Sequence, residues 1–71
     1  MNTLKELGNE ILKIDWRNHH AENTYTTFEN LCDDFDIYEF NIDELRASGF
    51  NDYDVAEIMQ VYHIHTVLSM A

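Results

Sequence analysis

The residues best suited to chemistry in this 71-residue chain are its carboxylates, and their distribution is uneven. Ten of the fourteen acidic residues fall between positions 29 and 57, where Arg46 is the only basic residue, so this stretch carries a formal charge of −9 out of −10. Residues 58–71 contain no Asp, Glu, Lys or Arg. The ten acidic residues, called the acidic block below, are Glu29, Asp33, Asp34, Asp36, Glu39, Asp43, Glu44, Asp52, Asp54 and Glu57.

The four histidines are the next candidates, because imidazole is a common metal ligand. His63 and His65 are two positions apart, which places them on nearly opposite sides of a helix, whereas helical zinc sites use a spacing of four. On a strand the two would share a side, but a third ligand would have to come from His19 or His20. These spacings do not predict a metal site.

Calcium binding and catalysis are also disfavoured by the residue pattern. A calcium loop starting at Asp34 has Glu39 where the turn needs glycine and Leu45 where it needs glutamate. The chain lacks a glycine-rich phosphate loop and a nucleophile elbow. Cys32 falls on the apolar face of a predicted helix, where a thiol behaves as a small hydrophobic group. We therefore expect a protein that is not an enzyme and that uses no cofactor and no metal.

Direct binding to nucleic acid or to membranes is disfavoured as well. Phosphate backbones are bound through Lys and Arg, and the chain has four such residues. The longest uncharged run, 58–71, is too short and too polar for a membrane span. The N-terminal residues lack the apolar run of a signal peptide, and a lone cysteine is typical of a reducing compartment. We expect a cytoplasmic protein, located in the host cell cytoplasm if a phage encodes it.

Two helices are predicted in the first half of the chain. An apolar stripe that repeats every three or four residues predicts a helix over 3–15 with Thr3 as its N-cap. A second stripe of this kind predicts a helix over 26–36, with Thr26 in the same capping role. Residues 16–25 are predicted to be irregular.

A short capped helix is predicted over 42–48. Asn41 and Glu44 have the spacing of a capping box, in which each side chain accepts the other residue's backbone N–H. Gly49 stands where a helix exit needs a left-handed residue, and Phe50 follows it as the apolar partner of a Schellman turn. Ile42, at the start of this helix, is expected to face inward.

Residues 52–69 are predicted to form the longest helix, capped by Asn51 or Asp52. Beyond residue 58 this helix is apolar nearly all round, so it is either central to its own fold or covered by another chain. A strand over 61–67 is the minor alternative, because this segment is rich in β-branched and aromatic residues. If a second chain covers the helix, the interface residues are predicted to be Val61, Ile64, Val67 and Leu68.

These elements predict an all-α fold. The chain is long enough for one domain, so residues 1–71 are read as a single acidic helical domain with a single-layer core. A core of this size supplies only roughly 3–5 kcal/mol of net stability, which is why a homodimer is kept as an option. The predicted bundle has about four helices, at 3–15, 26–36, 42–48 and 52–69.

The acidic block leads to the functional hypothesis. Carboxylates mounted one helical turn apart stand about 5–6 Å from each other, a spacing similar to that of phosphates along a nucleic-acid strand. Small size, negative charge and helical pattern resemble those of nucleic-acid mimics, among them phage-encoded inhibitors of restriction (anti-restriction) and CRISPR systems (anti-CRISPR). The chain is therefore predicted to occupy the nucleic-acid-binding site of a basic protein or nuclease complex. Aromatic residues among the acids could anchor the contact: Tyr38, Phe40, Phe50 and Tyr53.

Two other interpretations stay open. An acidic face can serve only to keep a small protein in solution, although that function would favour acids spread over the whole surface. Alternatively, the protein is a small structural or adaptor module that homodimerises through its uncharged C-terminal helix, residues 58–71. The mimic and the adaptor use different surfaces, so both descriptions can hold for one molecule.

Overall fold

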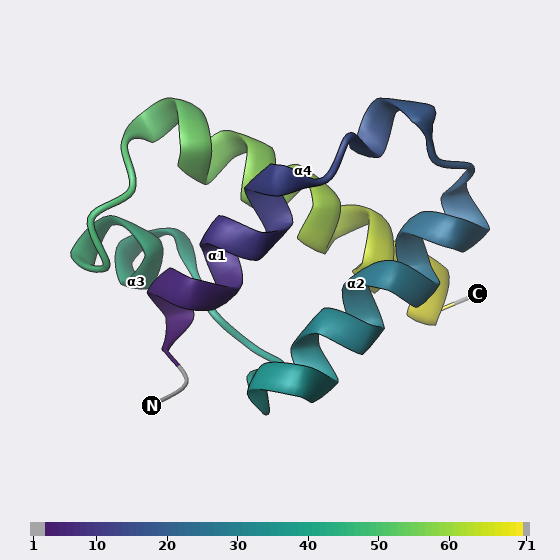
Figure 1. The fold of residues 1–71 in the computed structure, drawn as a ribbon, viewed down its shortest axis with the longest axis horizontal. Coiled ribbons are helices and arrows are strands. Elements are labelled where there is room, and N and C mark those ends of the chain that lie inside the picture. Colours follow the sequence, from purple (N-terminus) through teal and green to yellow (C-terminus); the bar gives the residue numbers. More distant parts are fainter. Residues whose placement is uncertain (1–2, 71) are drawn as a thin grey trace.

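The computed structural model describes residues 3–70. Within this range the chain forms four α-helices, one short 3-10 helix and no strand. The elements fold into a globule of 30 × 24 × 21 Å, in which α4 packs against the other three α-helices (Figure 1). The all-α prediction is confirmed, and the strand alternative for 61–67 is wrong because these residues are helical. The bounds are α1 (Leu4–Lys13), η1 (Trp16–Asn18), α2 (Ala21–Phe35), α3 (Ile42–Ala47) and α4 (Asp52–Ser69).

α1 begins as predicted but ends two residues before the predicted position 15. The Thr3 hydroxyl accepts the Glu6 N–H at 3.2 Å and so satisfies one of the amides left free at the helix start. The extended backbone of Ile14, with φ −90° and ψ 136°, ends the helix. The Ile11 carbonyl in the last turn accepts the Ile14 N–H at 3.3 Å and also the Trp16 indole N–H at 2.7 Å.

α2 begins five residues earlier than predicted, and the predicted span of 26–36 is corrected accordingly. Thr26, expected to cap the helix, lies inside it, where its hydroxyl donates to the Glu22 carbonyl at 3.1 Å. His20 occupies the N-cap position without any capping bond from its side chain. The start of α2 therefore lacks a side-chain cap.

α3 has the capping and the exit that its sequence predicts, although it ends one residue before position 48. The Asn41 side chain accepts the Glu44 N–H at 2.8 Å, and the Glu44 carboxylate accepts the Asn41 N–H at 3.0 Å. Gly49 has a φ of +106°, and the Phe50 N–H donates back to the Leu45 carbonyl at 3.3 Å. These features form a Schellman turn, which sends the chain from α3 into α4.

α4 has the predicted bounds, and Asn51 is the residue that caps it, through a 2.8 Å bond from the Asp54 N–H to its side chain. The helix contributes Val55, Ile58 and Val61 to the core. Because α4 contacts α1, α2 and α3, it is central to this fold. None of the helices within residues 3–70 combines the length and the apolar character needed to cross a membrane.

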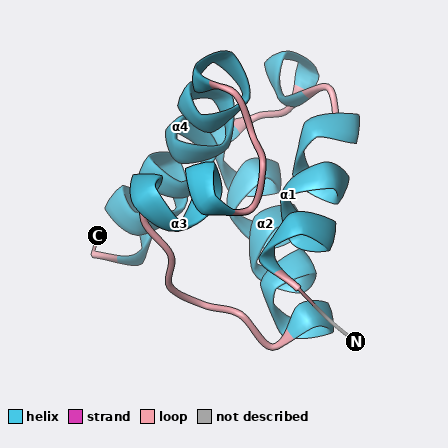
Figure 2. Cartoon of the chain, turned by 90° about the vertical axis from the view of Figure 1, so that its left-hand side faces the viewer, coloured by secondary structure: helices cyan, strands magenta, loops and turns pink. Residues whose placement is uncertain are grey.

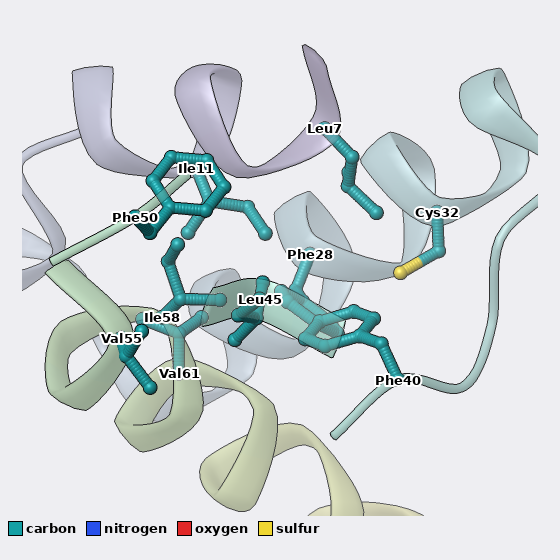
Figure 3. Packing of buried hydrophobic residues seen from close by; sticks show 10 residues of the cluster. All are labelled: Leu7, Ile11, Phe28, Cys32, Phe40, Leu45, Phe50, Val55, Ile58 and Val61. Carbon is teal, nitrogen blue, oxygen red and sulfur yellow. The ribbon is translucent and has the colours of Figure 1, made fainter. Parts of the chain in front are cut away.

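The core is one cluster of buried apolar side chains drawn from every α-helix and from the loops around α3 (Figure 3). Phe50 enters this core across Gly8 of α1, where an added Cβ would overlap the phenyl ring. Lys5 lies over the same ring, with its Nζ 4.4 Å from the ring centroid. The buried residues of the cluster are Leu7, Ile11, Phe28, Cys32, Phe40, Leu45, Phe50, Val55, Ile58 and Val61.

Candidate partner-binding surface

The acidic block follows a continuous length of backbone around one side of the molecule. In Figure 1 it occupies the second half of α2, the connector to α3, α3 itself and the start of α4, along the lower and left-hand sides. Figure 2 shows the connector as the long loop between the ends of α2 and α3. The opposite end of the molecule is formed by η1, the first half of α2 and the second half of α4. Charge is thus segregated in space as well as in sequence.

The carboxylates of the block face solvent. Nine of its ten residues are exposed and Asp54 is half-buried. The acids are therefore accessible to a partner. Four of the ten lie in the first turns of α3 and α4, where the positive end of the helix dipole stabilises negative charge. These four, which the helix starts favour, are Asp43, Glu44, Asp52 and Asp54.

Acids at the end of α2 are in the opposite situation, because the last turn of a helix carries partial negative charge. Asp36 sits just beyond this turn in the left-handed conformation, with a φ of +56°. The Ile37 N–H donates to the Cys32 carbonyl at 3.1 Å, and the Asp36 N–H donates to the Asp33 carbonyl at 3.3 Å. This is a second Schellman turn, with an aspartate at the position that glycine usually takes.

Few cations oppose the block within residues 3–70. Arg46 pairs with Asp52 at 3.1 Å, and both side chains are exposed, so this pair is weak in water. His65 of α4 lies 3.4 Å from the Glu29 carboxylate of α2, an ion pair only when the imidazole is protonated. The stretch from 29 to 57 has a formal charge of −9, so the block has a strong negative field.

The aromatic residues expected to anchor a partner divide into two groups. Tyr53 is 76% exposed and Tyr38 is 56% exposed, as an anchor requires. Phe40 is only 7% exposed, because it packs edge-on against Tyr62 with a centroid distance of 4.7 Å. Phe50 is buried as well, so the assignment of these two phenylalanines as anchors is wrong.

One exposed apolar residue beside the block was missed. Ile42, expected to face inward, is 45% exposed at the first position of α3. It lines a shallow groove together with Phe40 and Met59, and with Arg46 on the polar side. Its position at the start of the helix, where no earlier turn covers it, was the available signal for this exposure.

Tyr38 is tied to the end of α2 by its hydroxyl, which donates to the Asp33 carboxylate at 2.8 Å. This hydrogen bond to Asp33 is the main reason that the pKa of the Tyr38 phenol is raised above its ordinary value of 10.0. The bond holds an exposed aromatic ring beside the carboxylates instead of leaving it free to rotate. Tyr38 is therefore an exposed ring whose hydroxyl is fixed to the block by a hydrogen bond.

Cys32 lies under the block and is buried, as its apolar stripe predicts. Burial raises the pKa of its thiol from 9.0 to about 11, with smaller contributions from the negative charges of Asp33 and Glu29. At neutral pH the group is a protonated thiol, which is a poor nucleophile. It serves the packing between α2 and its neighbours.

Two of the four histidines, His19 and His65, pack against aromatic rings. His65 stacks on Tyr25 of α2, with ring centroids 4.5 Å apart and planes at 12°. His63, two positions away on α4, is exposed. His19 lies against Trp16, at a centroid distance of 5.5 Å. Across residues 3–70, His, Cys, Asp and Glu side chains do not gather in any group of three that could hold a metal ion.

The four residues predicted for a dimer interface differ in burial. Val61 is buried in the core of its own chain and is not accessible to a second one, so it does not belong to such a surface. Ile64 and Leu68 are half-buried, and Val67 is 49% exposed. Met70, at the end of the same helix, is exposed and was not anticipated.

Comparison of the whole chain with family models, with curated proteins and with solved structures found no match.

Proposed function

We propose that this protein binds a basic, nucleic-acid-handling protein or nuclease complex through the acidic block and thereby occupies the site of the nucleic acid. The observation that carries the proposal is the position of the ten acids, nine of them exposed, on one connected length of helices and turns. Arg46 is the only Lys or Arg in that stretch. In this proposal the protein blocks the nucleic-acid site of its partner and catalyses no reaction.

Spacing along the helices supports mimicry of a phosphate backbone. Glu29 and Asp33 are one turn apart on α2, and Asp54 and Glu57 are one turn apart on α4, so each pair stands about 5–6 Å apart. Such like-charged pairs cost a helix roughly 0.2–0.5 kcal/mol each. A partner with Lys and Arg placed for phosphates would find carboxylates at comparable intervals and remove this repulsion on binding.

Apolar contact would add to the electrostatic attraction. Tyr38 and Tyr53 are exposed within the block, and aromatic side chains are among the most frequent hot-spot residues of protein interfaces. Ile42 adds an aliphatic side chain between them in the sequence. The field of the block would speed the encounter, and added salt would slow it and weaken the complex.

The test begins with the immobilised protein and a cell lysate. Proteins that a DNA duplex elutes from the column are identified, purified and mixed with labelled duplex in a mobility-shift assay. We expect the protein to displace the duplex from at least one of them, and the competition to weaken at least tenfold between 50 and 200 mM salt, as about tenfold or more is usual for multiple ionic contacts.

Matched neutralisations show whether the block itself is responsible. Glu39→Gln with Asp43→Asn removes two charges from the block, and Glu6→Gln with Glu22→Gln removes two charges outside it. The first pair should weaken the competition at least tenfold, and the second should change it less than twofold. Equal losses for the two pairs would show that net charge alone matters, and the proposal would be abandoned.

A further inference from the structure

The second half of α4 carries an exposed stripe that the acidic block does not explain. Gln60, His63, Val67 and Met70 are all exposed and follow one another at spacings of three, four and three. That is the spacing of a heptad seam, in which one helix packs along another, although only Val67 and Met70 of the four are apolar. Ile64 and Leu68 border the stripe and are half-buried, so the apolar surface is wider than the seam itself.

No formal charge lies on this surface, because α4 has no Asp, Glu, Lys or Arg after Glu57. Two copies, each of charge −10, would repel each other if their acidic blocks met. The Debye length is about 8 Å at physiological salt, while the longest dimension of the molecule is 30 Å. Two copies that meet at the uncharged end would therefore keep their acidic blocks apart and largely screened from each other.

Charges at the edges of the stripe complement one another. Arg17 of η1 lines a groove beside α4 together with Ile64 and Glu57, and none of the salt bridges in the described part of the chain involves Arg17. On the other edge, Glu22 of α2 lies in a hollow with Leu68. A twofold axis that runs along α4 would bring the Arg17 edge of each copy toward the Glu22 edge of the other, and each contact would occur twice.

We infer that the exposed stripe of α4, residues 60–70, is a homodimer interface whose occupant is the same stripe of a second copy. A standard interface buries about 800 Å² on each partner, which would be close to a sixth of the 4858 Å² surface of this molecule. Val67 and Met70 are the large exposed hydrophobic side chains of the stripe, so we expect the dimer to be weak. The dimer would present two acidic blocks at opposite ends, which raises avidity for a repeated basic partner.

Sedimentation equilibrium of the intact chain tests this inference. Between about 10 µM and 1 mM, the range of a weak dimer, the weight-average mass should rise from 8.4 kDa toward twice that value. The association should change little at 0.5 M salt, because salt screens both the repulsion between the two acidic blocks and the Arg17 contacts at the edge. Binding through the acidic block should instead weaken steeply with salt, so the two proposals fail independently.

Two aspartate substitutions form a matched pair for this experiment. Val67→Asp places a charge in the stripe, and Ile42→Asp places one at a similarly exposed aliphatic residue, 45% against 49%, outside it. We expect Val67→Asp to weaken association more than tenfold and Ile42→Asp to leave it unchanged, with both variants retaining the helical circular dichroism of the wild type. Arg17→Glu should weaken association at least twofold by placing like charges at the edge.

Two results would overturn the inference. A wild-type chain that stays at 8.4 kDa up to 1 mM would mean that the stripe is covered by a partner of another sequence or by none. A Val67→Asp variant that dimerises as the wild type does would place the interface elsewhere on the molecule.

Discussion

α2 and α3 end in the same backbone turn, but the left-handed residue and the burial of the apolar residue after it differ between the two turns. At the exit of α3, Gly49 supplies the left-handed residue at no steric cost, and Phe50 is buried in the core. Gly8 of α1 leaves room for the Phe50 ring, and Lys5 covers its outer side. This exit is built for packing.

The exit of α2 is built from residues that oppose stability. Asp36 holds a left-handed φ with a Cβ, which costs roughly 1–2 kcal/mol for most residues and less for aspartate, and it adds a negative charge to the negative end of a helix. Ile37, which corresponds to Phe50, is only half-buried. Tyr38 follows it and remains exposed.

The difference shows where the chain favours stability and where it favours the display of charge. Both exits have the hydrogen bonds of a Schellman turn, so the geometry alone does not require an acid at either of them. At the α2 exit glycine or asparagine would serve the backbone better. The aspartate there is consistent with the proposed use of the acidic block as a binding surface.

The largest expected effect comes from truncating the two apolar residues that follow the turns. Phe50→Ala should destabilise the protein by about 3–5 kcal/mol, since a buried aromatic side chain leaves a cavity. A loss of that size equals the whole stability of a small domain, roughly 3–5 kcal/mol. Ile37→Ala should cost about 1–2 kcal/mol, because the side chain is half exposed. Urea unfolding followed by circular dichroism measures both, and equal losses would contradict the contrast between the exits.

An effect of intermediate size is the pH dependence of stability caused by Cys32, whose carbonyl closes the turn at the end of α2. The pKa of Cys32 is about 11 in the folded chain against 9.0 ordinarily, so the unfolded chain loses the thiol proton first as pH rises. The stability that the buried, protonated thiol contributes is therefore complete below pH 9 and is lost progressively between pH 9 and 11, by up to about 2–3 kcal/mol.

Cys32→Ala isolates this contribution, because the other titrating groups remain in the variant. The difference in unfolding free energy between the wild type and Cys32→Ala should shift in favour of the variant as pH rises from 8 to 10.5. A difference that is constant across this range would show that the thiol is not shielded from water as its burial indicates.

The smallest effects should have opposite signs at the two left-handed positions. Gly49→Ala should destabilise the protein by about 1–2 kcal/mol, because a Cβ is strained at positive φ. Asp36→Asn should stabilise it by about 0.3–1 kcal/mol, since it removes a negative charge from the helix end and keeps a residue that tolerates this φ. The gain should shrink in 0.5 M salt. A loss of stability in Asp36→Asn would mean that the carboxylate has a structural role in the turn.

Local signals explain which parts of the fold were predictable. The start and exit of α3 and the bounds of α4 depend on contacts within a few residues, such as the Asn41 cap and the Gly49 turn, and sequence spacing shows them directly. The start of α2 was misplaced because Thr26 and Glu29 have the spacing of a capping box, while the actual N-cap, His20, makes no capping bond.

The candidate surface was predicted in its charges and only half predicted in its aromatic residues. Acids face solvent for a local reason, the cost of desolvating a charge. Phe40 is buried for a distant one, because Phe28 of α2 and Tyr62 of α4 enclose it. These two neighbours are 12 and 22 positions away from Phe40 in the sequence. The residues next to Phe40 therefore do not indicate that it is buried.

The place of α4 in the fold has a consequence for the synthesis of the chain on the ribosome. α4 supplies Val55, Ile58 and Val61 to the core and contacts the three helices that precede it. While residues 52–69 are still inside the ribosome, α1 can contact α2 and α3, but the part of their apolar faces that α4 covers stays open. Folding of this protein should therefore follow the emergence of its fourth helix, and the nascent chain should remain sensitive to proteases until that moment.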